Sequence, residues 1–273
     1  MDVRVVTDSN AMLPASLRDR FGIAVVPLTV VVDGQAHHET DLDATWFCAR
    51  LRAGAEVSTA APAPGQLLAA YEAAATSGAD AVLSVHVGAN QSATVAAAGV
   101  AAGMADIPVR VVDTGTASFI EGCCVWRAAE ALAGGADVEA AGAAAARIAS
   151  SAASVFTIGE IARANDGGRL PVAAGEGVPV YCSAGPDMRE LARVGDVDEA
   201  AAAMAAAVAE AEGPLRVGVG DADAPEAADA LEAVLRDLPQ VAEVVRYVVG
   251  PSVAAHTGAG TFGAVFHPLD GGA

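Results

Sequence analysis

The sequence predicts an α/β protein of two domains: an N-terminal three-layer domain with a parallel sheet (1–154) and a C-terminal α/β domain with a mixed sheet (155–273). In the first half, short apolar runs alternate with longer alanine-rich helical windows, which is typical of a parallel sheet with helices on both faces. After about Ser154 fewer helical windows separate the apolar runs, which favours a mixed sheet. A length of 273 residues suits two modest domains.

The elements of the first half follow from apolar runs and turn residues. The apolar stretch Ala24–Val32 is either a strand pair or one bent strand, closed by a turn at Asp33-Gly34. Pro14 suits the first turn of a helix. The other expected strands are Val3–Val6, Ala81–His86 and Val109–Asp113, and the expected helices are Ala15–Phe21, Thr45–Ala53, Pro64–Ser77, Ser92–Met104, Cys123–Ala133 and Val138–Ser150.

The second half carries strands and helices in a less regular order. A glycine-rich turn is expected at Gly167-Gly168-Arg169, where the arginine has a structural role. Strands are expected at Val155–Ile158, Val178–Cys182, Leu215–Val219 and Val241–Val249, and helices at Val197–Ala211 and Ala224–Leu235.

The composition excludes several classes of function. The 34 acidic residues outnumber the 15 basic ones, for a net charge of -19, which argues against nucleic-acid binding and against contact with anionic membranes. All the basic residues are arginines, so the chain has no P-loop lysine and no Schiff-base lysine. It also shows no secretory signal and no apolar stretch of membrane-spanning quality, so a cytoplasmic protein without integral membrane contact is expected.

Polar side chains follow two of the expected strands. Thr7, Asp8 and Ser9 come directly after Val3–Val6, and ligands bind at the carboxyl ends of strands in open α/β sheets. Ser92 follows another strand and begins a helix, where its hydroxyl suits an N-cap. The same helix start would suit a carboxylate or phosphate, so a plain cap and an anion site both stay open.

Two further clusters have weaker signals. The glycines of His256-Thr257-Gly258-Ala259-Gly260 let a ligand approach the backbone, which makes His256 a candidate contact. Gly258, Gly260 and Gly263 form a GxGxxG, but too few residues follow for a dinucleotide-binding unit. The cluster His37-His38-Glu39 with Asp41 is the best metal-like group but is interpreted as solvated surface. The four cysteines have no zinc-site spacing, so no metal is expected.

Taken in order, these motifs resemble those of the DegV family of fatty-acid-binding proteins, over nearly the whole chain. The segment Pro171–Gly177 is shorter than its counterpart in that family. The motifs that carry the resemblance are Val6-Thr7-Asp8-Ser9, Val25-Val26-Pro27-Leu28, Val57-Ser58-Thr59-Ala60-Ala61-Pro62, Ser92-Ala93-Thr94, Val112-Asp113-Thr114, Gly167-Gly168-Arg169-Leu170 and His256-Thr257-Gly258-Ala259-Gly260.

The resemblance implies a carrier that holds a long-chain fatty acid, such as a C16–C18 acid, in an apolar tunnel between its domains. It also implies that the carboxylate is presented to a separate ATP-dependent fatty acid kinase of the dihydroxyacetone-kinase-like type. No cofactor, catalytic residue or nucleic-acid partner is implied. The implied ligand contacts are Thr59, Ser92, Ala93, Thr94, His256 and Gly258, and the implied supporting residues are Asp8, Ser9, Asp113 and Arg169.

Two other hypotheses stay open. The chain is alternatively a small-molecule enzyme that handles acyl or phosphoryl groups, with Asp8 and His256 as acid and base. The other hypothesis is a DegV-like interaction module whose lipid site has decayed. Ala60 and Ala61, which stand in place of polar residues, motivate it.

Overall fold

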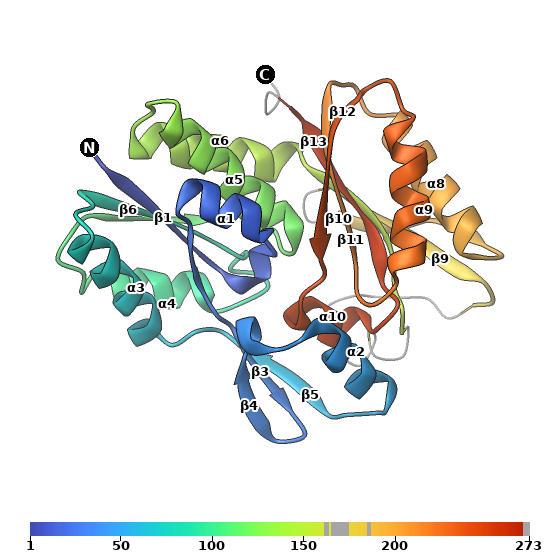
Figure 1. Cartoon of the computed structure of the whole chain (residues 1–273), viewed down its shortest axis with the longest axis horizontal. Helices are drawn as coiled ribbons and strands as arrows, with labels where there is room; N and C mark the ends of the chain where they lie inside the picture. Colours follow the sequence, from blue (N-terminus) through green and yellow to red (C-terminus); the bar gives the residue numbers. More distant parts are fainter. Residues whose placement is uncertain (161–163, 165–174, 185–186, 270–273) are drawn as a thin grey trace. The chain divides into compact units, whose positions relative to one another are not determined.

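The computed structural model describes residues 1–160, 164, 175–184 and 187–269 (Figure 1). The chain divides into two compact units. The first unit comprises Met1–Val30, Ala36–Thr40 and Thr59–Ser150, and the second comprises Val31–Gln35, Asp41–Ser58 and Ser151–Ala273. The boundary between 154 and 155 that the sequence suggests stays a prediction. No helix among the described residues is both long and apolar enough to cross a bilayer.

The first unit is built on a four-stranded sheet in which every neighbouring pair is parallel, as expected. Its order is β2-β1-β6-β7. All residues of β6 are buried, as the apolar character of this run predicts for a central strand. The strands are β1 (Val3–Asp8), β2 (Ala24–Val26), β6 (Ala81–His86) and β7 (Val109–Asp113).

Helices cover both faces of this sheet (Figure 1). On one face, α3 (Pro64–Thr76) and α4 (Thr94–Ala102) bury Leu67, Tyr71 and Ala98 against Val6 and Val82. On the other face lie α1 (Ala15–Phe21), α5 (Phe119–Ala133) and α6 (Val138–Ser151), and a short 3₁₀ helix, η1 (Ser9–Ala11), follows β1 directly.

The stretch Ala24–Val32 forms two strands that belong to different sheets. Residues Ala24–Val26 pair with β1, whereas β3 (Thr29–Val32) joins a separate three-stranded sheet of order β4-β3-β5. The other strands of that sheet, β4 (Gln35–His38) and β5 (Val57–Ala60), were not expected. Their residues are mostly exposed or half-buried, so they lack the apolar pattern that reveals a strand. The 3₁₀ helix η2 (Glu39–Asp41) follows β4, and α2 (Ala44–Arg52) comes next in the chain.

The second unit is built on a six-stranded mixed sheet of order β10-β9-β8-β13-β11-β12. Only β11 and β12 are parallel, and the other neighbours are antiparallel, which confirms the mixed sheet. The strands are β8 (Ala153–Thr157), β9 (Val178–Ala184), β10 (Asp187–Val194), β11 (Leu215–Asp221), β12 (Val241–Val248) and β13 (Phe262–Pro268).

Two amphipathic helices cover this sheet, and a third packs elsewhere in the unit. Met204 and Val208 of α8 (Val197–Ala209) and Leu231 of α9 (Pro225–Arg236) share a core with Val217 of β11. The helix α10 (Pro251–Thr257) packs against α2. Neither α10 nor β13 was expected, because glycines interrupt the apolar pattern there; β10 was missed because it carries charged residues. The predicted turn Gly167–Arg169 lies outside the described residues.

Candidate functional site

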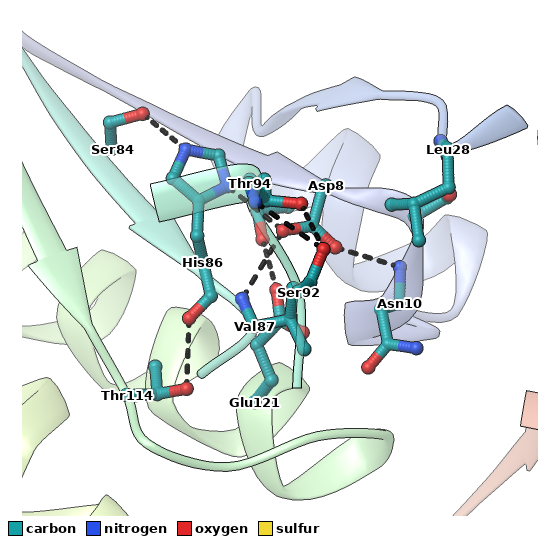
Figure 2. A network of polar contacts seen from close by, with 12 residues as sticks. Asp8, Asn10, Leu28, Ser84, His86, Val87, Ser92, Thr94, Thr114 and Glu121 are labelled. Carbon is teal, nitrogen blue, oxygen red and sulfur yellow. Dashed lines mark hydrogen bonds and ion pairs between the residues drawn. The ribbon is translucent and has the colours of Figure 1, made fainter. Parts of the chain in front are cut away.

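Asp8 ends β1 with its side chain wholly buried, and hydrogen bonds hold both of its carboxylate oxygens (Figure 2). Oδ1 accepts from the backbone N–H of Asn10 at 3.0 Å, and Oδ2 accepts from the backbone N–H of Val87 at 3.2 Å. Nδ1 of His86 lies 2.9 Å from Oδ2. Asp8 therefore connects the start of η1 to the segment that follows β6. The two N–H groups that it binds would otherwise be left unpaired by the helix and by the sheet ladder.

A line of buried polar groups runs from Asp8 through the sheet. The other ring nitrogen of His86, Nε2, lies 2.7 Å from Ser84 Oγ, and that oxygen lies 2.8 Å from Tyr71 Oη. All these groups are satisfied when the Tyr71 O–H donates to Ser84, the Ser84 O–H donates to His86, and the Nδ1–H donates to Asp8. A neutral His86 fits this direction of donation, and an ionised Asp8 completes it.

Glu121, on α5, is a second wholly buried carboxyl group beside Asp8 (Figure 2). Its Oε1 accepts from Thr7 Oγ1 at 3.1 Å, whereas Oε2 has no hydrogen-bond partner as a plain acceptor. Burial, then the charge of Asp8, raise the pKa of Glu121 well above its ordinary value of 4.5. A hydrogen bond to Asp8 raises it further, so a protonated Glu121 donates to the Asp8 carboxylate.

Ser9 and Glu39 form a third polar contact near the end of β1. Ser9 Oγ donates a hydrogen bond to Glu39 Oε2 and accepts from the backbone N–H of Leu28 at 2.9 Å. The interpretation of His37-His38-Glu39 as solvated surface is wrong for Glu39, which is only 5% exposed. The backbone of η2 turns this side chain inward, where the Ser9 hydroxyl compensates its burial. Among the residues that the structure describes, no group of three acidic, histidine or cysteine side chains could hold a metal ion.

The loop between β6 and α4 is fixed along its backbone. Besides Val87 N–H on Asp8, Gly88 N–H donates to Thr116 O at 2.7 Å, and Ala89 N–H donates to Asp113 Oδ1 at 3.1 Å. Gly88 leaves no room for a side chain, because a Cβ there would lie 2.6 Å from the carbonyl carbon of Gly115. Consecutive N–H groups therefore hold this loop in one conformation.

Ser92 and Thr94 lie together where this loop becomes α4 (Figure 2). Their hydroxyl oxygens are 2.8 Å apart, and Ser92 Oγ also accepts from the Thr94 N–H at 3.3 Å. The exposed Ala93 occupies the N-cap position, so Ser92 caps the helix from one residue further out than the sequence suggested. Thr94 is buried and Ser92 half-buried. When Thr94 donates to Ser92, the Ser92 O–H proton points to an acceptor outside the pair.

The remaining predicted contacts lie on other elements. Thr59 is half-buried on β5. His256 is half-buried in the last turn of α10, in the second unit. Gly258 follows it with a φ of 83°, and a Cβ there would lie 2.4 Å from Glu160 Cβ, so only glycine fits. Arg169 lies outside the described residues.

The structure thus brings several predicted residues of the first unit into one network and adds some that the sequence argument missed. Asp8 and Asp113 both bind N–H groups of the β6–α4 loop that carries Ser92. Glu121 and His86 were not singled out. The signal for His86 was present, because Ser84 and His86 are polar residues at alternate positions of a wholly buried strand. Glu121 carried no such signal.

Comparison with known proteins identifies the family. The family model of DegV matches residues 2–269. A DegV domain-containing protein of Streptomyces coelicolor is 36% identical over 273 residues, covering 96% of this chain and 97% of that protein. The chain belongs to the DegV family. Residues Val6–Ser9, the first of the motifs noted in the sequence, lie at the strand end that holds Asp8.

Solved structures of DegV family proteins share the fold. One is a family member from Thermus thermophilus that is described as binding fatty acid. It matches with a TM-score of 0.89 at 30% identity, over 98% of this chain and 100% of that one. DegV of Bacillus subtilis, described as a fatty acid binding protein, matches with a TM-score of 0.85 at 25% identity, over 98% of this chain and 99% of that one. The α/β architecture described above is therefore the DegV fold.

Proposed function

We propose that this protein binds one long-chain fatty acid and holds its carboxylate at the start of α4. The observation that carries the proposal is the Ser92–Thr94 hydroxyl pair, 2.8 Å apart, at the end of a loop fixed by Asp8 and Asp113. Hydroxyl and backbone N–H donors at a helix N-terminus suit a carboxylate. The fatty-acid binding described for the Thermus thermophilus and Bacillus subtilis relatives supports the same ligand class.

Each predicted residue has a role in this proposal. Thr59 and Ser92 donate hydroxyl hydrogen bonds to the carboxylate, and the backbone of Ala93 and Thr94 supplies the helix N-terminus. His256 and Gly258 line a further side of the site, and position 258 accepts only glycine. The acyl chain, of the C16–C18 class, occupies an apolar tunnel between the domains. Asp8, Ser9, Asp113 and Arg169 support the contact residues without touching the ligand.

We further propose that the protein is a carrier and not itself an enzyme. Its partner is an ATP-dependent fatty acid kinase of the dihydroxyacetone-kinase-like type, to which it presents the carboxylate. The burial of Asp8 supports this over the enzyme alternative: the side chain is 0% exposed, and both its oxygens accept hydrogen bonds inside the protein. An acid or base of that kind has no access to a substrate proton.

Ser92→Ala tests the proposed contact. A hydrogen bond to a charged group contributes roughly 1.5–3 kcal/mol, so the variant should bind oleic acid about tenfold to a hundredfold more weakly. Ser150→Ala is the matched control, because the Ser150 hydroxyl is exposed and donates to its own helix at Arg147 O. Titration calorimetry with delipidated protein measures both affinities. Equal affinities for Ser92→Ala and Ser150→Ala would remove Ser92 from the site.

Thr59 has its own internal control, since Ser58 precedes it on β5. Successive residues of a strand point to opposite faces, so the two hydroxyls cannot contact the same ligand group. Thr59→Ala should weaken oleic acid binding by about the factor expected for one lost hydrogen bond, whereas Ser58→Ala should not. The reverse ranking would place the ligand on the other face of β5.

A further inference from the structure

We propose that Glu121, in its acid form, is a positioning residue for the fatty-acid site: it donates to Asp8 and so keeps Asp8 bound to the N–H of Val87. The inference rests on the proposed function, because it assigns Glu121 to the loop that carries Ser92. Glu121 itself touches no ligand, and it acts through Asp8 and the β6–α4 loop.

Hydrogen-bond donors from several elements surround the Asp8 carboxylate. The carboxylate accepts from the N–H groups of Asn10 and Val87 and from His86, while Glu121 hydrogen-bonds to it from α5. A buried carboxylate away from water is stable only when hydrogen bonds surround it. Glu121 fills the remaining place in that shell, since the other donors come from β6 and η1.

Glu121 is protonated in this arrangement. Its Oε1 is occupied by the Thr7 hydroxyl, and its Oε2 lacks a partner unless it carries a proton. The titratable groups that face it are Asp8 on β1, with His86 of β6 behind it, Glu39 on η2 and Cys124 on its own helix. Two of them are carboxyl groups, so a charged Glu121 would meet negative charge at close range.

The proton on Glu121 is linked to the ligand loop. Loss of the proton removes a donor from Asp8 and places a second negative charge beside it. The two carboxylates then repel each other, and a displacement of Asp8 should weaken its 3.2 Å contact with Val87 N–H. The loop that ends in Ser92 loses one of its backbone anchors, so ligand binding should weaken as Glu121 ionises.

Glu121→Gln separates this mechanism from a merely structural role. The glutamine amide donates to Asp8 and its oxygen accepts from Thr7, so the contacts persist without a titrating proton. Oleic acid affinity of delipidated protein is measured across neutral and alkaline pH for the parent and for this variant. The parent should lose about tenfold relative to Glu121→Gln as pH rises, the effect of one lost hydrogen bond to a charged group. The ratio between the proteins also cancels the ionisation of the ligand.

Glu121→Ala completes the series. It removes the donor at every pH, so its affinity should be about tenfold below that of Glu121→Gln throughout. Parallel pH profiles of the parent and Glu121→Gln would overturn the inference. The inference would also be overturned if Glu121→Gln bound oleic acid as weakly as Glu121→Ala at neutral pH, because the glutamine keeps the contacts with Asp8 and Thr7.

Two measurements without ligand keep this test distinct from that of the proposed function. The infrared C=O band of a buried protonated carboxyl should be present in the parent at neutral pH and absent in Glu121→Gln. Amide exchange of residues 87–92 should accelerate with pH more in the parent than in Glu121→Gln. If no variant binds oleic acid while both signals appear, the proposed function fails, and what stands is only the effect of the Glu121 proton on Asp8 and on the β6–α4 loop. If the band is missing from the parent, the positioning role fails regardless of binding.

Discussion

Replacement of Glu121 by glutamine should change how the stability of the first unit depends on pH. In the unfolded chain Glu121 ionises above its ordinary pKa of 4.5, whereas in the fold burial and the charge of Asp8 keep it protonated to a much higher pH. Between these two pKa values the folded state holds one proton more than the unfolded state. The free energy of unfolding of the parent therefore falls by about 1.4 kcal/mol for each pH unit in that window.

Glutamine carries no such proton, so the free energy of unfolding of Glu121→Gln lacks this slope. The two proteins should have similar stability near the lower end of the window. Within that window, the variant should gain about 1.4 kcal/mol over the parent for each pH unit. Stability that is fully present below the unfolded pKa is thus lost as pH rises toward the folded pKa.

Urea unfolding at a series of pH values measures this difference. A Trp46→Phe background leaves Trp126, on the same helix as Glu121 and 2% exposed, as the only tryptophan of the chain. Trp46 is 43% exposed, so its removal should cost little. A constant difference in the free energy of unfolding between parent and variant across the pH series would mean that Glu121 is ionised in the fold.

Three further predictions follow from buried contacts. Tyr71→Phe removes the donor to Ser84 and should lower the free energy of unfolding by about 1 kcal/mol in urea unfolding. An unchanged free energy of unfolding would mean that the Tyr71 hydroxyl is not paired. Gly122→Ala would place a Cβ 2.2 Å from the carbonyl oxygen of Ala11, so overpacking should cost about 1–3 kcal/mol and lower the melting temperature; a rise would contradict the close approach. Burial raises the pKa of Cys48 from 9.0 to about 11, so near pH 8 its thiolate fraction should be about a hundredfold below that of a cysteine peptide. Alkylation of Cys48 as fast as that of the peptide would contradict this raised pKa.

Much of the fold could be predicted because its strands are apolar runs. The runs Ala81–His86 and Val109–Asp113 coincide with β6 and β7, because buried parallel strands require such residues on both faces. β4 and β5 could not be predicted in the same way, since they are short and partly exposed and contain polar residues. In these strands the backbone pairing with β3, not side-chain burial, decides the structure.

The site could be predicted only where the residues follow strand ends. Asp8 ends one apolar run, and Ser92 lies at the end of the loop that follows another, so their place at the carboxyl end of the sheet follows from the parallel topology. Glu121 could not be found in this way, because an acidic residue in the first turn of a helix usually faces solvent and favours the helix dipole. Its burial depends on a contact with Thr7, 114 positions away in the chain, that no local pattern encodes.

Native mass spectrometry of the protein purified from cells tests the fatty-acid proposal most directly. We expect a population with the added mass of one long-chain fatty acid, which is released on denaturation and reloads when a C16 or C18 acid is added to delipidated protein. Protein that is empty as purified, and that also fails to take up added C14–C18 acids, would mean that it does not bind fatty acids.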